Sequence, residues 1–323
     1  VIGTGGSSLS SKALINLNIY NSDIDIKFLE NIDPIITKRL IDKINFSDTV
    51  FLVISKSGET FETIALVSLL IDEINSNHKN YNFQDHFHFI TSNKMSKIRT
   101  IALSLEANIY DHDAVGGRFS AFTNVGLLIS HISGLDIYKI RFGAKLIIDD
   151  LFNLKKDSII AKSVINIMSL KNKINNIVTI VYSDQLIDFN MLNRQIWAES
   201  TGKMGEGITP ITAIGTIDQH SQLQLYLDGP KDKLFHIITI DHNDDIPLSK
   251  LIKAERQATI ENLISKNIFV KTMELQKLDE IEIGMLVMQS MLESILFCKL
   301  NNINPFNQDA VEINKKLIAD KLI

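Results

Sequence analysis

The chain has 323 residues, of which 45% are hydrophobic, and a formal net charge of −5 at pH 7. This length favours two domains, each long enough to bury a core of its own. The negative charge and the lack of a basic cluster argue against a nucleic-acid partner, and no apolar run reaches the ~18 residues that span a bilayer. The single cysteine, Cys298, excludes an intrachain disulfide. No segment has the pattern of a signal peptide, so we expect a cytoplasmic protein.

The first half of the chain alternates short apolar strands with amphipathic segments. Strands are predicted at Val1–Gly3, Ile26–Glu30, Thr49–Ser55 and His86–Thr91. Helices are predicted at Ser7–Ile15, Asp33–Ile44, Thr60–Ile74, Met95–Leu105 and Phe122–Ile132. This alternation is typical of a parallel sheet covered by helices on both faces. Because Val1–Gly3 has the character of the end of a buried strand, we expect the chain to lack an N-terminal segment of its domain.

A domain boundary is predicted between Gly134 and Gly143, giving domains of residues 1–140 and 141–323. A second alternation follows, with strands predicted at Asn176–Ser183, Leu234–Asp241 and Ile268–Glu274. Helices are predicted at Ala144–Leu154, Ile159–Leu170, Gln185–Ser200, Ser221–Leu227, Leu248–Lys266, Ile281–Lys299 and Asp309–Lys321. We therefore predict an α/β protein of two domains, each a mainly parallel sheet sandwiched by helices.

Two loops follow predicted strands and have the composition of phosphate-binding turns. The first is Gly3-Thr4-Gly5-Gly6-Ser7-Ser8, and the second is Ser55-Lys56-Ser57-Gly58-Glu59-Thr60. Ligands of open parallel sheets bind beyond the carboxyl ends of the strands. Glycines permit close approach there, and hydroxyls, a lysine and helix N-termini attract an anion.

Two simpler interpretations compete with the phosphate sites. Ser7 and Thr60 can serve as plain helix caps. A dinucleotide site is also conceivable, because Gly3-x-Gly5 begins the required spacing and Glu30 stands where an acidic residue would bind ribose. However, Ser8 occupies the third glycine position, and a dinucleotide gives the second loop no role. A phosphorylated small molecule is the better match.

Glu199 lies in the segment Trp197-Ala198-Glu199-Ser200-Thr201-Gly202-Lys203, which ends a long predicted helix. A solvated glutamate in a last helical turn is the simpler interpretation. If it is partly buried, its carboxylate meets the negative end of the helix dipole, which makes it a stronger general base. Trp197 would then supply an apolar wall.

Two further segments carry groups that can move protons. Asp218-Gln219-His220-Ser221-Gln222 begins a helix, and residues 306–315 lead to Lys315 on the last helix. Taken alone, such a histidine is more often structural or exposed, and such a lysine more often belongs to a solvated helix face. His112 next to Asp113 suggests a metal pair, but no further ligand stands at metal spacing, so we expect a site without metal or other cofactor.

The most informative stretch of the sequence is the run Asp113-Ala114-Val115-Gly116-Gly117-Arg118-Phe119-Ser120. Alone, Gly-Gly-Arg is an ordinary surface turn with a solvated arginine. The full octet resembles a signature of the glucose-6-phosphate isomerases, also called phosphoglucose isomerases. The two loops and the Glu199, His220 and Lys315 segments follow in that family's order, and residues 218–224 are similar to its short prokaryotic form. The resemblance covers almost the whole chain and implies two sugar-isomerase domains.

The resemblance also implies the reaction and the role of each residue. Glucose 6-phosphate and fructose 6-phosphate would interconvert through a cis-enediolate, a step of glycolysis and gluconeogenesis that needs no cofactor. Glu199 would move the proton between C1 and C2, and Arg118 would stabilise the enediolate. His220, from the partner subunit of a homodimer, and Lys315 would assist ring opening. The ligand would be bound by residues that we list as Gly6, Ser7, Ser55, Lys56, Ser57, Thr60 and Gln308.

The sequence departs from the family pattern near these residues without changing an assigned one. Ser10 stands where the family usually has glycine, and Glu59, where threonine is common, brings a negative charge close to a phosphate site. Two alternatives stay open at this point: a non-catalytic module that binds a sugar phosphate, and an isomerase for another hexose phosphate such as mannose 6-phosphate or an amino sugar phosphate.

Overall fold

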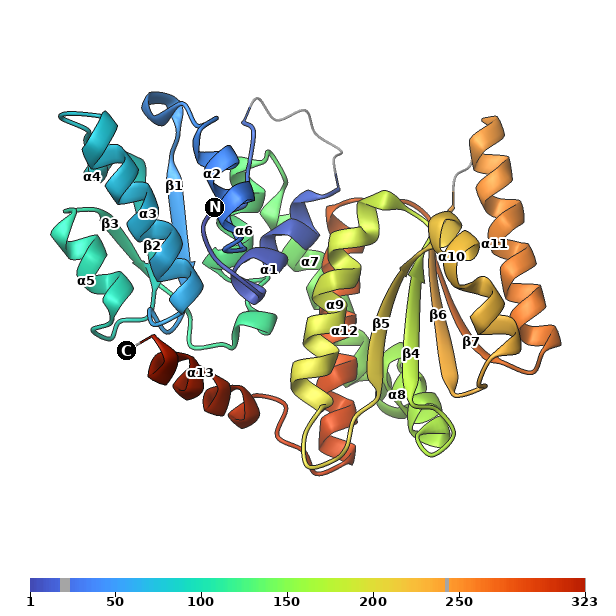
Figure 1. Ribbon diagram of the computed structural model, residues 1–323. Coiled ribbons are helices and arrows are strands. Elements are labelled where there is room, and N and C mark those ends of the chain that lie inside the picture. The colour runs from blue at the N-terminus through green and yellow to red at the C-terminus, as the bar shows by residue number, and fades with distance from the viewer. Residues whose placement is uncertain (18–23, 242–243, 323) are drawn as a thin grey trace. The chain divides into compact units, whose positions relative to one another are not determined.

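The computed structural model describes residues 1–17, 24–241 and 244–322 (Figure 1). The chain folds into two compact units, Val1–Ile137 and Tyr138–Ile323. Each unit has a parallel sheet with helices packed against it, which confirms the predicted α/β class.

The sheet of the first unit contains three parallel strands in the order β1-β2-β3. These are β1 (Phe51–Ser55), β2 (Phe87–Thr91) and β3 (Asn108–Asp111). The helices are α1 (Gly6–Ile15), α2 (Pro34–Ile41), α3 (Phe61–Asn77), α4 (Phe83–His86), α5 (Lys97–Ser104) and α6 (Asn124–Ile132). Successive residues of a strand point to opposite faces, so a sheet with helices on both sides needs apolar residues at every position. All five residues of β1 are buried.

The two faces of this sheet bury different clusters. Phe51 and Val53 belong to a cluster with α3 and α5, whereas Leu52 and Ile54 pack with α6. Because burial on both faces fixes the register of β1, the residues that follow Ser55 leave the sheet at one defined edge. The register Ser55↔Thr91↔Asp111 brings the chain beyond all three strands to that same edge.

Some predicted elements of this unit differ from the observed ones. Val1–Gly3 and Ile26–Glu30 are not full strands: Ile2 forms isolated parallel bridges with Leu29 and Val53. The prediction missed β3, because its polar and largely exposed residues lack the apolar character of a buried strand. The short helix α4 was also missed.

The second unit has four parallel strands in the order β5-β4-β6-β7. They are β4 (Asn176–Val181), β5 (Thr209–Ile214), β6 (Lys233–Ile240) and β7 (Phe269–Leu275). The helices are α7 (Ile137–Leu154), α8 (Ile159–Leu170), α9 (Ile187–Thr201), α10 (Gly215–Asp228), α11 (Pro247–Ser265), α12 (Glu280–Leu300) and α13 (Asp309–Lys321). The prediction missed β5, an edge strand with Pro210 at its second position, where a missing N–H is tolerated.

Alternation again divides the core between the two faces. Val178 and Ile180 of β4 pack in a cluster that includes residues of α10 and α11, and Ile177 packs with α8, α9 and α12. Among the described residues, one helix, α12, is long and apolar enough to cross a membrane, but 61% of that window is buried inside the fold. Its partners within the unit are α8 and α9, so α12 has the character of a core helix.

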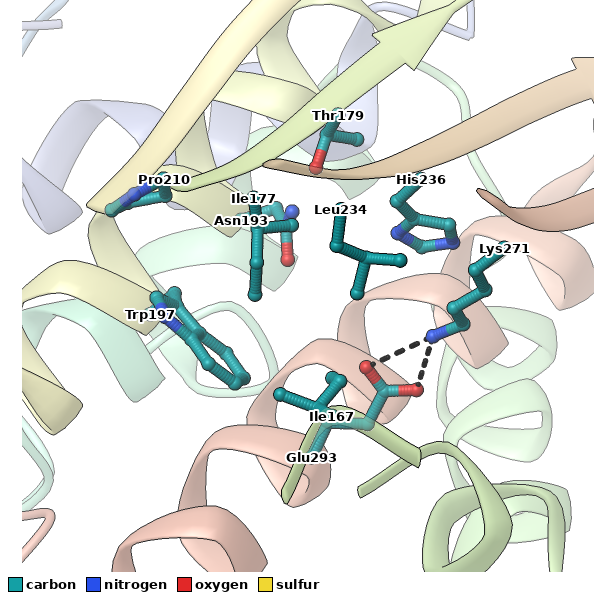
Figure 2. A pocket seen from close by; sticks show the side chains of 10 residues that line it. All are labelled: Ile167, Ile177, Thr179, Asn193, Trp197, Pro210, Leu234, His236, Lys271 and Glu293. Carbon is teal, nitrogen blue, oxygen red and sulfur yellow. Dashed lines mark hydrogen bonds and ion pairs between the residues drawn. The ribbon is translucent and has the colours of Figure 1, made fainter. Parts of the chain in front are cut away.

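A small pocket lies between this sheet and helices α8, α9 and α12 (Figure 2). Trp197 stands at its apolar end, and an ion pair stands at its polar end. There, Lys271 Nζ contacts both carboxylate oxygens of Glu293, at 2.9 and 3.3 Å, and donates to Ser163 Oγ at 2.7 Å. His236 is the register partner of Lys271, and its buried Nε2 has no hydrogen-bond partner among the described residues.

This arrangement predicts that acid weakens the second unit. Burial lowers the pKa of His236 well below its usual value, and Lys271 lowers it further. Below about pH 6.5 the unfolded chain therefore binds more protons than the folded one, and this residue decreases the free energy of unfolding by up to about 1.4 kcal/mol per pH unit. His236→Gln should remove that slope, whereas His220→Gln, which changes an exposed residue of α10, should keep it. Denaturant unfolding between pH 5 and 8 measures both, and equal slopes for wild type and His236→Gln would contradict the prediction.

Candidate functional site

The loop after β1 turns sharply at Gly58, whose φ of 67° favours glycine. Ser55 Oγ lies 3.2 Å from both Gly58 N and Thr60 Oγ1, and Ser57 Oγ accepts from Glu59 N at 3.2 Å. Thr60 is the N-cap residue of α3, yet its side chain makes no cap hydrogen bond in the described structure. The plain-cap interpretation of Thr60 is therefore wrong, and the N-terminus of α3 is open to an anion.

Glu59, in the same loop, binds a neighbouring helix. Its Oε1 accepts a hydrogen bond from Lys97 N at 2.9 Å, at the beginning of α5. A carboxylate at that helix N-terminus is stabilised by the helix dipole. The negative charge that the sequence places in this loop thus stabilises the beginning of α5.

The first loop opens α1 in a similar way. Gly5 is the N-cap residue, with a φ of 60°, and no side chain caps α1 among the described residues. Ser7 lies inside the first turn, half-buried, so it is not the cap that the simpler interpretation required. Both loops therefore present uncapped helix N-termini together with hydroxyl groups, a combination that suits a phosphate.

Gly6 lies against the Gly-Gly-Arg turn. A Cβ at Gly6 would overlap the carbonyl group of Gly117 and come within 2.7 Å of Arg118 N. Ser120 Oγ donates to Gly117 O at 2.6 Å and lies 3.2 Å from Ser10 Oγ. The two backbones are thus in direct contact, and buried hydroxyls of α1 and of the turn hold them together.

Arg118 lies in the short 3-10 turn Gly117–Phe119 and is only 1% exposed. Its guanidinium carbon lies 5.1 Å from the centre of the Phe119 ring. The interpretation as a surface turn with a solvated arginine is therefore wrong. A buried arginine of this kind keeps its charge and presents a rigid set of donors, which suits a developing oxyanion.

Lys56 connects the second loop with the chain that leads to this turn. Its Nζ lies 3.4 Å from Ala114 O, beyond the end of β3. Ser92 N donates to Lys56 O at 3.1 Å, and His112 N donates to Thr91 O at 2.8 Å. The carboxyl edge of the first sheet therefore brings Lys56 and the beginning of the Gly-Gly-Arg segment together.

Glu199 is half-buried in the last turns of α9. Gln195, one turn earlier, donates its Nε2 to Glu199 Oε1 at 2.8 Å. Trp197 is buried, and its indole N–H donates to Ile208 O at 2.9 Å. The carboxylate is thus partly shielded from solvent, and the bond from Gln195 orients one of its oxygens.

His220 is exposed and lies in the second turn of α10. The helix begins at Gly215, six residues before the predicted start at Ser221. Hydrogen bonds around it stabilise this turn: Asp218 accepts from Ile214 N at 2.7 Å, and Gln219 Nε2 donates to Thr259 Oγ1 of α11 at 2.7 Å. Burial raises the pKa of Asp218, but its three hydrogen bonds outweigh this and bring it below the usual value.

Lys315 and Gln308 belong to the C-terminal helix segment. Gln308 is the half-buried N-cap residue of α13, and Lys315 is exposed, with its Nζ 2.6 Å from Glu312 Oε1. Glu199, His220 and Lys315 therefore come from three different helices of the second unit, whereas Arg118 and both loops belong to the first unit.

Sequence reasoning gave no role to Gln195 or to the Ser10–Ser120 pair. Two features of the sequence could have indicated them. Gln195 precedes Glu199 by four residues, one helical turn, and Ser10 stands where the family usually has glycine.

The model of the phosphoglucose isomerase family matches residues 1–231. The chain belongs to the phosphoglucose isomerase family. It is 32% identical to the glucose-6-phosphate isomerase of Campylobacter jejuni, with 100% of this chain and 84% of the relative covered. It is also 32% identical to that of Methanocaldococcus jannaschii, with 98% and 82% covered.

Solved structures agree on the fold of this phosphoglucose isomerase family member. A Thermus thermophilus protein, described as the hypothetical protein TT0462, has a TM-score of 0.91 at 26% identity and covers 100% of this chain and 84% of its own. The tagatose-6-phosphate ketose/aldose isomerase of Escherichia coli, at 13% identity and with a TM-score of 0.61, shows a shared fold. The match covers 94% of this chain and 82% of that protein.

The acidic residue of the competing dinucleotide interpretation, Glu30, forms an ion pair with Lys12 at 2.6 Å.

The contact between Gly6 and Gly117 predicts a difference between two glycine substitutions. Gly6→Ala forces the turn away from α1 and should lower the free energy of unfolding by about 1–3 kcal/mol. Gly116→Ala is the matched control in the same turn, because its Cβ would meet only Phe119 Cδ2, at 3.8 Å. Denaturant unfolding of both variants measures the difference. Equal stability of the two would show that the close contact is not formed.

Proposed function

We propose that this chain catalyses the reversible isomerisation of glucose 6-phosphate and fructose 6-phosphate. The observation that carries the proposal is Arg118, a fully buried arginine whose turn contacts Gly6 of a loop suited to phosphate. Membership of the phosphoglucose isomerase family supports the substrate pair. Each unit is then one sugar-isomerase domain.

The 6-phosphate is bound by the two loops of the first unit. Ser55, Ser57 and Thr60 supply hydroxyls at the N-terminus of α3, and Lys56 supplies a positive charge. Gly6 and Ser7, at the beginning of α1, line the sugar and contribute to anion binding. Support comes from the beginnings of α1 and α3, which have no side-chain cap, and from the hydrogen bond that Glu59 accepts at the beginning of α5.

Proton transfer between C1 and C2 needs a base on one side and an anion stabiliser on the other. Glu199 takes the proton from one carbon and returns it to the other, as glutamate bases do in related enediolate chemistry. Arg118 stabilises the cis-enediolate that forms in between. The bond from Gln195 to Glu199 Oε1 supports this role, because it orients the carboxylate.

Ring opening needs an acid and a base at the ring oxygen and the C1 hydroxyl. His220 and Lys315 take these roles, and Gln308 contacts the ligand from the segment before α13. We further propose that the protein is a homodimer in which His220 serves the partner's site. The exposure of His220 on a well-anchored turn of α10 supports a role outside its own unit.

Glu199→Gln keeps the shape of the side chain but removes its basicity. We expect kcat to fall by about 10²–10⁴-fold with little change in stability, since general-base catalysis contributes about that factor. Glu261→Gln is the matched control, because Gln257 donates to Glu261 Oε1 at 2.8 Å with the same spacing of four. A coupled assay with glucose 6-phosphate and a panel of other hexose phosphates measures both. Ligand binding without turnover in the wild type would instead support a non-catalytic sugar-phosphate module.

The shared site predicts complementation between two inactive variants. A mixture of Glu199→Gln and His220→Ala subunits forms heterodimers with one intact site, so activity should recover to about a quarter of the wild-type value after random exchange. Each variant alone should stay inactive. A mixture as inactive as its components would show that His220 acts within its own chain or not at all.

A further inference from the structure

His112 is a buried histidine at the carboxyl edge of the first sheet that no step of the proposed reaction uses. It directly follows β3 and is 6% exposed. Its Nδ1 lies 2.7 Å from the carbonyl oxygen of Asp113. Since a carbonyl oxygen only accepts, the neutral ring carries its proton on Nδ1 and a lone pair on Nε2.

The Nε2 atom of His112 is buried and has no hydrogen-bond partner among the described residues. A buried polar atom without a partner is costly, and in a native fold it often marks the place of a missing ligand or water. Here that atom belongs to a residue at the edge of the sheet where ligands of parallel sheets bind. The Nζ of Lys56, from the phosphate loop, reaches this segment at Ala114 O.

Burial is the main cause of the lowered pKa of His112, and the charges around the ring modify it. Burial lowers the pKa of His112, the hydrogen bond to Asp113 O raises it, and the positive charge of Lys56 lowers it; the net shift is downward. The carboxylate of Asp113 acts in the opposite direction, and Asp111, on β3, is already paired with Arg99 of α5 at 3.4 Å. A phosphate dianion bound next to Lys56 would cancel the positive charge that disfavours protonation.

We propose that His112 is a proton-linked part of the phosphate site: it is neutral in the free protein and takes up one proton from solvent, on Nε2, when a phosphorylated ligand binds. The inference rests on the proposed phosphate site but goes beyond it. In the protonated ring, Nε2 donates a hydrogen bond, whereas in the neutral ring it could only accept one. The protonated ring also gives the site a second positive charge besides that of Lys56. Binding of the dianion therefore becomes tighter as the pH falls, by linkage.

The test uses glucitol 6-phosphate, an open-chain phosphate ester without a carbonyl group, as the probe for binding to the full-length protein. His112→Asn keeps an N–H that can donate to Asp113 O but cannot titrate. Between pH 8.5 and 6.5, wild-type affinity should increase about tenfold more than that of His112→Asn, which corresponds to the uptake of about half a proton averaged over these two pH units. The titration of the phosphate itself is common to both proteins and cancels. His131→Asn, an exposed change on α6, should behave as wild type.

The outcomes separate a proton-linked role from a structural one. A merely structural role of His112 would weaken binding equally at every pH, and parallel pH profiles of wild type and His112→Asn would overturn the inference. Calorimetric binding to the wild type at pH 7.5 in two buffers of different ionisation enthalpy gives the proton uptake without any variant, so the test survives if His112→Asn does not fold. Binding without uptake overturns this inference alone, whereas no binding at all overturns it together with the proposed phosphate site.

Discussion

The contact between the backbones of Gly6 and Gly117 is the constraint on which the first unit's site depends. It brings the beginning of α1 against the turn that carries Arg118, and no side chain fits between them. Ser10 and Ser120 hold the two segments together with a buried pair of hydroxyls. Because the turn cannot move away without breaking this packing, the buried arginine is fixed before any substrate arrives. Such preorganisation is what makes a charged group effective towards a developing anion.

Two carboxylates near the glycine- and serine-rich loops of the first unit have partners outside those loops. Glu59 Oε1 accepts from Lys97 N at the beginning of α5, and Glu30 pairs with Lys12. The helices α1 and α3 begin without side-chain caps in the described structure. A side-chain cap would stabilise the N-terminus of α3 by about 0.5–2 kcal/mol, but that of α1, where Gly5 is the N-cap residue, by only a few tenths of a kcal/mol. The uncapped beginnings therefore represent a local loss of stability at the positions where an anion would restore it.

The sequence was sufficient for the elements with strong apolar periodicity and for the glycine loops, but not for features that depend on long-range contacts. The strands β1, β4 and β6 are nearly continuous apolar runs, so they were predicted within two residues. The prediction missed the edge strands β3 and β5. The polar residues of β3 lack the apolar pattern of a buried strand, and Pro210 argues against a strand at β5. Burial of Arg118 could not be inferred locally, since the chain around Gly6 encloses its turn from a distant part of the sequence. The roles of Glu199, His220 and Lys315 came from the family resemblance and remain proposals.

Two histidines, each with a buried Nε2 atom, differ in their position in the sheet. His236 lies inside β6, between the register partners Thr179 and Lys271 and beneath the helix layer. His112 lies just beyond the last residue of β3, beside the loop that carries Lys56. Both have a buried Nε2 without a partner in the described structure, and burial lowers the pKa of each. His236 lines the small pocket beside the Lys271–Glu293 ion pair, and its lowered pKa couples protonation of the ring to unfolding. His112 lies at the carboxyl edge, where ligands of parallel sheets bind, and for this ring we propose that protonation is coupled to binding instead.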